Sequence, residues 1–580
     1  MGVEGLRGYL GRSDKFKSAF RSKLSEPISS LFIDCNGIFY TALANVYKTN
    51  EDEKVRKKIL KRNKDVLQKE HLDEIVRILE KVIMELKPSD NLIIAVDGQV
   101  PVAKMNQQKS RRFKSALEKS ALSAFDRNAL TPGTDFMIKI DQKLSSWVSE
   151  NSSNLSKRVI YSSHLSPGEG EHKIFDYIRR GDLLPTTGAN VIYGLDNDLI
   201  ILSILSGIDN FYMKPEDRNE GRKERFISVD RMRQIIIRDF RFDGVDEKLL
   251  IQDFSVMMML AGNDFLHKLP NSSQSFDILF PIMANVYKRT SKHLTDEENN
   301  INWRSYLRYM KNYNEYGGEN NHFIKYYLHP KVHPYPEIMR NITISGKDGS
   351  KTNDVVFDKT KHNLTFDFLK FSKEWYQKQF NPEVVQWNGE RVETYDNNLI
   401  KNMCISYMKT VQWVQYYYTR GHKSVSQLHS YRYLYTPLVA SILTVLVRII
   451  KSEKLWGLGM VLRDQDKLEL NVIHQLFSVI PYQSLPVIPK MYQTLYSDNM
   501  SELNPSIFEV SDHNTDKEHQ KLAIIPLVNV FYVDQVLRDS DIRYPDSILT
   551  KPDEIYMKED DPVESKRSRT GYRVSKEYLI

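Results

Sequence analysis

The chain has 580 residues, of which 41% are hydrophobic and 27% are charged. This balance is typical of a globular protein and excludes collagen-like, low-complexity and membrane-embedded chains, and the length predicts about four domain-sized units. The net charge of +7 is small for this length, so only the distribution of basic residues can indicate nucleic-acid binding.

The two cysteines, Cys35 and Cys404, give no disulfide framework, and no Cys/His set has the spacing of a zinc site. We therefore expect a reducing compartment, with the cytoplasm as the default location and the nucleus as the alternative. The first residues lack the apolar core of a signal peptide. The apolar stretch over 433–447 contains Pro437 and stops at Arg448, so it predicts a buried helix, and no membrane association is expected.

Three short apolar runs in the first 200 residues each end at an aspartate. They are 31–33 before Asp34, 92–96 before Asp97 and 191–195 before Asp196. Runs of this length without polar alternation are typical of strands buried on both faces of a parallel sheet. Helical patterns follow over 54–86, 103–130 and 251–261. The sequence therefore predicts an α/β domain, whose ligands would lie at the carboxyl ends of the strands.

The rest of the chain divides by composition. A polar stretch over 340–363 predicts an exposed loop. The aromatic-rich segment after it, with an apolar helix over 438–450, predicts a second and mostly helical region. The end of the chain from 551 is expected to be either flexible or a strand added to the rest. We thus expect an N-terminal domain over 1–285, a connecting region over 286–363, the second region over 364–530 and a C-terminal tail over 531–580.

Seven acidic residues fall at strand ends or beside glycines. They are Asp34, Asp97, Glu169, Glu171, Asp196, Asp198 and Asp264. Taken singly, a strand-end Asp is more often a helix N-cap, and a Glu-Gly-Glu sequence is more often a solvated loop. Together, so many carboxylates cannot stay ionised in a partly buried cleft without cations. We therefore expect Mg²⁺ or Mn²⁺, two ions that would hold both oxygens of an in-line phosphoryl displacement.

A basic helix follows Asp97 closely. Between 100 and 117 the chain has five positive charges and no negative one. Four side chains of this helix share one face: Lys104, Gln108, Arg111 and Arg112. Such a run is more often a solvated helix face, but its place beside Asp97 favours a phosphate pocket, in which Arg offers bidentate contacts and Lys a point charge.

Six motifs carry a resemblance to a known family. They are 34–37, 97–113, 132–134, 168–174, 194–198 and 262–266, and weaker similarity continues through 416–418, 431–437, 480–486 and 524–526. Their order and content resemble the XRN family of 5′→3′ exoribonucleases, in a compact form with the two shared regions. The resemblance implies a PIN/FEN-like core, that is, a twisted parallel sheet flanked by helices, with the second region packed on it. It also implies processive hydrolysis of single-stranded RNA with a 5′-monophosphate to nucleoside 5′-monophosphates.

The resemblance also implies roles for individual residues. The seven acids would hold two Mg²⁺ ions, and the pocket for the 5′-phosphate would be formed by Lys104, Gln108, Arg111 and Arg112. Tyr40 stands where the family has a base-stacking His, and can still stack. The family's Trp-x-Trp segment is Val-Ser-Gln at 425–427, so weaker translocation is expected unless another aromatic, such as Tyr433, replaces it. Lys109 and His267 also differ from the usual residues, but neither is a proposed metal ligand.

Two other functions stay open at this point. A FEN-like, structure-specific DNA nuclease would use the same acidic geometry, because the sequence does not reveal contacts to the 2′-OH of RNA. A catalytically idle RNA-binding scaffold would keep the fold without the chemistry. RNA with a 5′-monophosphate end is the expected partner, and a monomer is the expected state. The basic run 566–569 is a weak nuclear signal, more often a solvated stretch.

Overall fold

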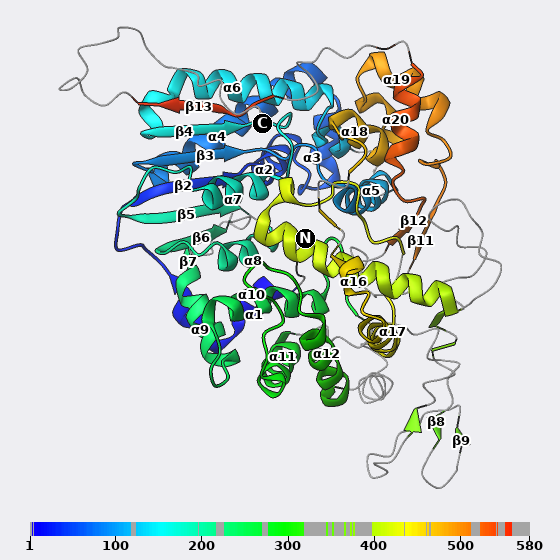
Figure 1. The fold of residues 1–580 in the computed structure, drawn as a ribbon. Helices are drawn as coiled ribbons and strands as arrows, with labels where there is room; N and C mark the ends of the chain where they lie inside the picture. Colours follow the sequence, from blue (N-terminus) through cyan, green and yellow to red (C-terminus); the bar gives the residue numbers. More distant parts are fainter. Residues whose placement is uncertain are drawn as a thin grey trace.

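The computed structural model describes most of the two regions expected from the sequence. The described residues are 3, 5–117, 123–194, 196–215, 226–269, 276–317, 397–433, 436–459, 461–462, 466–511, 522–540, 542 and 551–558, with short pieces between 344 and 376 (Figure 1). Of the predicted loop over 340–363, only the strands β8 (Ile344–Ser345) and β9 (Lys351–Thr352) are described. The basic run 566–569 lies outside the described residues.

A mainly parallel sheet organises the N-terminal domain. In the described part of the chain it has eight strands in the order β1-β7-β6-β5-β2-β3-β4-β13. They are β1 (Phe20–Arg21), β2 (Ile28–Asp34), β3 (Asn91–Ala95), β4 (Arg158–Ser162), β5 (Ala189–Gly194), β6 (Phe211–Pro215), β7 (Phe226–Ser228) and β13 (Glu554–Met557). The five central strands from β6 to β4 are parallel. The three predicted strands are thereby confirmed, and they lie next to one another as β5, β2 and β3.

Helices cover both faces of this sheet. Those of the N-terminal domain are α1 (Leu6–Arg12), α2 (Asn36–Tyr47), α3 (Glu53–Leu60), α4 (Lys64–Leu86), α5 (Val102–Leu117), α6 (Asp135–Leu155), α7 (Gly170–Arg180), α8 (Asp198–Leu205), α9 (Val229–Phe240) and α10 (Glu247–Met258). Within β2, Leu31 and Ile33 pack in one core with α2, α4 and α6. Phe32 packs in the other core, with α7, α8 and α9. Every residue of β2 is therefore buried, as a strand covered on both faces requires.

Two of the predicted helices are shorter than expected. The helix predicted over 54–86 is two helices, α3 and α4, because Asn63 starts a new helix: its side chain accepts hydrogen bonds from the backbone N–H groups of Asp65 and Val66. The helix predicted over 103–130 ends as α5 at Leu117, and a short 3-10 helix, η2 (Arg127–Leu130), follows further on. The prediction over 251–261 corresponds to α10 and a 3-10 turn, η3 (Met259–Ala261).

The second region is mostly helical and packs directly on the first. Its helices are α16 (Asn397–Arg420), α17 (Val439–Lys451), α18 (Val472–Val479), α19 (Lys490–Asn499) and α20 (Val530–Arg538), with the short strands β10 (Thr365–Phe366), β11 (Glu509–Ser511) and β12 (Leu522–Ile524). Side chains of α16 and α17 share one hydrophobic core with α8 and α10. Side chains of α18, α19 and α20 share another with the start of α5 (Figure 1).

Parts of the predicted connecting region and tail are folded elements. The helices α11 (Phe276–Thr290) and α12 (Trp303–Gly317) pack on each other and belong to the same core as α16. Within the predicted tail, α20 is packed against α18, and β13 pairs antiparallel with the edge strand β4. Of the two alternatives for the end of the chain, the added strand is therefore found at residues 554–557.

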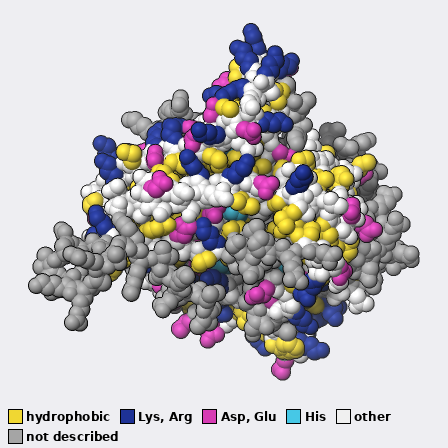
Figure 2. Space-filling model, turned by 90° about the horizontal axis from the view of Figure 1, so that it is seen from above, with side chains coloured by type: hydrophobic (Ala, Val, Ile, Leu, Met, Phe, Trp, Pro, Cys, Tyr) yellow, Lys and Arg dark blue, Asp and Glu magenta, His cyan; other side chains and the backbone are white. Residues whose placement is uncertain are grey.

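The described helices contain no candidate membrane span, and the charged side chains in view in Figure 2 are spread over the surface. None of the described helices is long and apolar enough to cross a membrane. Both cysteines are buried and free. Figure 2 shows Lys and Arg side chains scattered among acidic and apolar ones, with the densest group on the projection at the top of the view. On this face, surface charge alone therefore does not indicate a site.

Candidate metal and phosphate site

Three of the seven predicted acids meet at the carboxyl ends of the strands. Asp34 is the last residue of β2, Asp97 lies two residues after β3, and Glu171 is in the first turn of α7. One carboxylate oxygen from each lies within 4.8 Å of the other two. Asp34 and Glu171 are buried, and Asp97 is partly exposed. A compact set of carboxylate oxygens is the donor set that hard divalent cations prefer.

A glycine allows the loop before α7 to approach the strands closely. The backbone N–H of Gly170 donates a hydrogen bond of 2.7 Å to Oδ1 of Asp97. A Cβ atom at this position would lie 2.9 Å from Oδ1 of Asp34 and 3.2 Å from the carbonyl oxygen of Ala95. Residue 170 therefore has to be a glycine for the loop to bring Glu171 to the two aspartates.

The electrostatics of these acids require a positive charge. Burial raises the pKa of Asp34 well above its usual value, and the negative charges of Asp97 and Asp196 add to this effect. Burial, followed by the charge of Glu169, does the same to the pKa of Glu171. Without a cation, these buried carboxyls would bind protons. A divalent cation offsets the repulsion and favours the ionised form, so the donor set fits such an ion.

Lys104 lies among the remaining acids. Its ammonium group forms ion pairs with Glu169 and, at 2.7 Å, with Asp264. Burial opposes the charge of Lys104, but the acids, with Asp264 contributing most, outweigh it and raise its pKa. Burial and the charge of Asp264 raise the pKa of Asp198 to about 7. The structure thus places Lys104 against the carboxylates and joins Asp264, from the loop after η3, to the acids at the strand ends.

Two tyrosines of the second region bind the acidic residues directly. Tyr417 donates a hydrogen bond of 2.7 Å to Oε1 of Glu169. Tyr418 donates one of 3.0 Å to Oδ1 of Asp198. Both tyrosines are buried in α16. The sequence marks 416–418 as a motif but does not indicate this contact, because the direction of each ring depends on how α16 packs on α7 and α8.

The four predicted phosphate-binding residues all lie on α5 but face different partners. Lys104 contacts the acids, and Oε1 of Gln108 accepts a hydrogen bond from Gln475 of α18. Arg111 is exposed. Arg112 is buried, and its Nε donates a hydrogen bond of 2.7 Å to Oγ1 of Thr131. The arginines are thus the members of this set that are left to bind a phosphate.

Of these four residues, Arg112 has the clearest feature of an anion-binding site, a buried donor without a partner in the described part of the chain. Its Nη1 is buried and has no hydrogen-bond partner among the described residues. Burial, followed by the charge of Arg111, lowers the pKa of Arg112 to about 10, and nearby Tyr40 and Asp97 oppose this shift. A buried guanidinium with an unsatisfied donor costs free energy unless an anion binds it. A phosphate on Nη1 would satisfy the donor and offset the cost of burying the charge.

The residues at the family's aromatic positions differ in their exposure. Tyr40, on α2, is 36% exposed and can present its ring to a base. The side chain of Gln427 is buried and donates hydrogen bonds to the carbonyl oxygens of His422 and Val425, at 2.6 and 3.1 Å. It is therefore part of the local backbone packing. Tyr433 is partly buried, with its ring 5.7 Å from that of Tyr431.

Comparison with known proteins identifies both regions. A family profile described as XRN 5'-3' exonuclease N-terminus matches residues 1–216. A second profile, described as Xrn1 helical domain, matches residues 340–544. The two matches together cover the sheet with its acidic strand ends and most of the second region.

Curated relatives agree with the profiles. The chain is 26% identical to 5'-3' exoribonuclease 1 of Homo sapiens over 537 residues, which are 79% of this chain and 30% of the human protein. It is 24% identical to 5'-3' exoribonuclease 1 of Schizosaccharomyces pombe, over 86% of this chain and 45% of that protein. It is 32% identical to 5'-3' exoribonuclease 2 of Yarrowia lipolytica, over 35% of this chain and 26% of that protein. The chain thus spans less than half the length of each of these relatives.

Proposed function

Because the chain belongs to the XRN family of 5′-3′ exoribonucleases, we propose that it hydrolyses single-stranded RNA from a 5′-monophosphate end and releases nucleoside 5′-monophosphates. The observation that carries this proposal is the buried carboxylate group of Asp34, Asp97 and Glu171, with the unsatisfied guanidinium of Arg112 on the neighbouring helix. Acids that fit a cation and an arginine that fits a phosphate are the two parts that a phosphodiester hydrolase acting at a phosphorylated end needs.

Mg²⁺ or Mn²⁺ is the proposed cofactor. The three clustered acids would hold one ion, and the set of seven, which also includes Glu169, Asp196, Asp198 and Asp264, would hold two. Bound ions supply two effects, a lower pKa of the attacking water and stabilisation of the leaving 3′-oxygen. Tyr417 and Tyr418 keep Glu169 and Asp198 oriented through their hydrogen bonds.

Selection of the RNA end is assigned to α5 and α2. Arg112 and Arg111 would bind the terminal phosphate. Lys104, held by Glu169 and Asp264, and Gln108, bonded to Gln475, would lie beside it on the same helix without being its main ligands. We expect this pocket to accept a terminal monophosphate and to reject a bulkier cap, and the ring of Tyr40 would stack on the first base. The buried amide at 427 supports the expectation of weaker translocation, because it presents no ring to the RNA.

A time course on 3′-labelled RNA tests this proposal. The unmodified chain is given the same RNA with a 5′-monophosphate, a 5′-hydroxyl, a triphosphate or a cap, with Mg²⁺ or with EDTA. We expect degradation of the monophosphate RNA alone, and none in EDTA. Equal degradation of all four RNAs would contradict the proposal that α5 forms a pocket for the 5′-phosphate.

A matched DNA oligonucleotide is the control for substrate class. Strong preference for the DNA would establish the FEN-like alternative in place of the exoribonuclease. Absence of cleavage with every end, together with no heat of Mn²⁺ binding, would establish the scaffold.

A further inference from the structure

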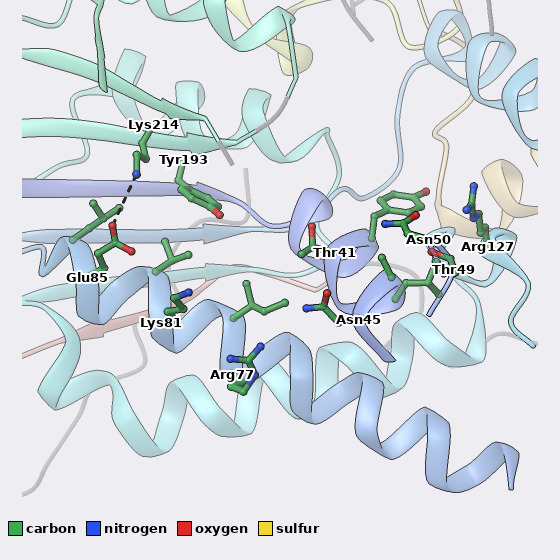
Figure 3. A pocket seen from close by; sticks show the side chains of 16 residues that line it. Thr41, Asn45, Thr49, Asn50, Arg77, Lys81, Glu85, Arg127, Tyr193 and Lys214 are labelled. Carbon is green, nitrogen blue, oxygen red and sulfur yellow. Dashed lines mark ion pairs between the residues drawn. The ribbon is translucent and has the colours of Figure 1, made fainter. Parts of the chain in front are cut away.

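A polar groove adjoins the acidic site on the N-terminal domain. It has a volume of about 600 Å³ and is lined by residues between 40 and 214. Figure 3 shows Tyr193 and Lys214 projecting from β5 and β6 on one side, and Arg77 and Lys81 lying on α4 on the other. Among the described residues, those that line the groove all belong to the N-terminal domain.

The lining of this groove is positively charged. Its described lining has four cations, Arg77, Lys81, Arg127 and Lys214, against one acid, Glu85. Arg77 is engaged by Glu74, with 2.6 Å between Nε and Oε2, and Lys214 lies 3.9 Å from Glu85. Lys81 and Arg127 are exposed, and the described residues give neither of them an acidic partner. The groove therefore attracts anions.

One end of the groove meets both parts of the proposed active site. Tyr40 lines the groove and lies one turn after Asn36 on the same face of α2. Oδ1 of Asn36 accepts a hydrogen bond of 3.2 Å from the backbone N–H of Asp97, and Tyr40 also opposes the lowering of the pKa of Arg112, which burial chiefly causes. Tyr193 pairs with Ile33 in the sheet and packs in the same core as α4, so its side chain lies on the face opposite to that of Asp34. The end of the groove at Tyr40 is therefore the one that leads to the acids. A ligand could therefore move from the phosphate pocket into the groove past Tyr40 without crossing the second region.

The other groups of the lining suit a nucleotide. Cations bind a phosphate, and the exposed ring of Tyr40 can stack on a base, whereas Tyr193 is buried and forms part of the wall. Thr41 and Asn45 of α2 line the groove between the two sides (Figure 3) and can exchange hydrogen bonds with ribose hydroxyls and base edges. The groove therefore contains groups that can bind the phosphate, the ribose and the base of a nucleotide.

We propose that this groove binds the nucleoside 5′-monophosphate product as it leaves the active site. This inference rests on the proposed exoribonuclease function. A chain that keeps hold of its RNA between cleavages needs a route for each product that the RNA does not occupy. The groove provides one on the N-terminal domain alone, with two exposed cations, Lys81 and Arg127, along it.

Calorimetry with adenosine 5′-monophosphate in EDTA tests the inference. The unmodified chain is expected to bind two molecules, one at the phosphate pocket and one in the groove. Lys81→Glu should weaken the groove site about tenfold, the effect of one charge-assisted contact, and leave the other site unchanged. Arg112→Ala should weaken binding at the phosphate pocket and leave the groove site unchanged. Lys69→Glu, an exposed position on the same helix that does not line the groove, is the control and should change neither site.

Three results would overturn the inference. A single AMP site in the unmodified chain is one, and equal effects of Lys81→Glu and Lys69→Glu are another. The third concerns RNA: if Lys81→Glu slows single-turnover removal of the first nucleotide as much as it weakens AMP binding, the groove holds the RNA strand instead. Failure of the proposed function is distinguishable, because AMP binding is measured without cleavage and would then persist in a chain that degrades no RNA.

Discussion

The hydrogen bond from Tyr417 to Glu169 offers a sharp test of how the second region serves the active site. Tyr417→Phe removes one hydroxyl group from a buried site and leaves the ring packing in place. The lost bond is 2.7 Å long and its acceptor is a carboxylate paired with Lys104. Hydrogen bonds to charged groups contribute about 1.5–3 kcal/mol. If this free energy orients Glu169 toward a cation, the metal affinity should fall by roughly 10- to 100-fold.

The assay is the initial rate of cleavage of 5′-monophosphate RNA as a function of Mg²⁺ concentration. Tyr417→Phe should shift the curve to higher Mg²⁺ and recover most of the rate at saturation. Tyr416→Phe is the matched control, because the Tyr416 hydroxyl donates to Asn300, away from the acids. Equal curves for the two variants, or a loss that Mg²⁺ does not restore, would refute the role given to Tyr417.

Three further predictions concern the acids, pH and the added strand. Gly170→Ala places a Cβ 2.9 Å from Oδ1 of Asp34, so cleavage should fall at least tenfold while the melting temperature changes little; unchanged cleavage would contradict the close approach. Burial lowers the pKa of His71 to about 4. Between about pH 4 and 6.5 the unfolded chain therefore binds more protons at this residue than the folded chain does. The unfolding free energy should fall by about 3 kcal/mol as the pH decreases across this window. Denaturant titrations should show that His71→Phe lowers this slope by the share of one proton, because other buried histidines such as His164 and His267 titrate in the same window. Asp553, just before β13, accepts hydrogen bonds from Ser162 and Tyr177. Asp553→Ala should therefore lower the unfolding free energy by about 1–3 kcal/mol, and no change would mean that these two hydrogen bonds do not stabilise the attachment of β13.

The strands that carry the acids were predictable because their burial leaves a simple signal. β2, β3 and β5 are apolar runs that stop at an aspartate, and all three are buried along their length. β6 gives no such signal, since it contains Lys214 and ends at Pro215. The charge of Lys214 is accommodated by Glu85 and by the ring of Phe226, partners that are distant in sequence. Only the folded chain reveals why a lysine is tolerated there.

The site was predictable by residue type more than by geometry. The seven acids and the basic face of α5 were predicted from strand ends and helix phase. The structure places three of the acids in one group. The hydrogen bonds of Tyr417 and Tyr418 span more than 200 residues of sequence, so no local pattern could predict them. The ion pairs of Lys104 with the acids could not be predicted either. Helix phase predicts the direction of a side chain but not the residue that it contacts.

The most direct test of the account is cleavage by an Asp34→Asn variant. The substitution keeps the shape of a buried side chain and removes one negative charge from the group formed with Asp97 and Glu171. Single-turnover cleavage of 5′-monophosphate RNA in Mg²⁺ and binding of the same RNA in EDTA are measured side by side. We predict that cleavage is lost and binding is retained, because in the proposed mechanism the carboxylates would hold the cation and Arg112 would hold the phosphate. Undiminished cleavage by Asp34→Asn would contradict the account.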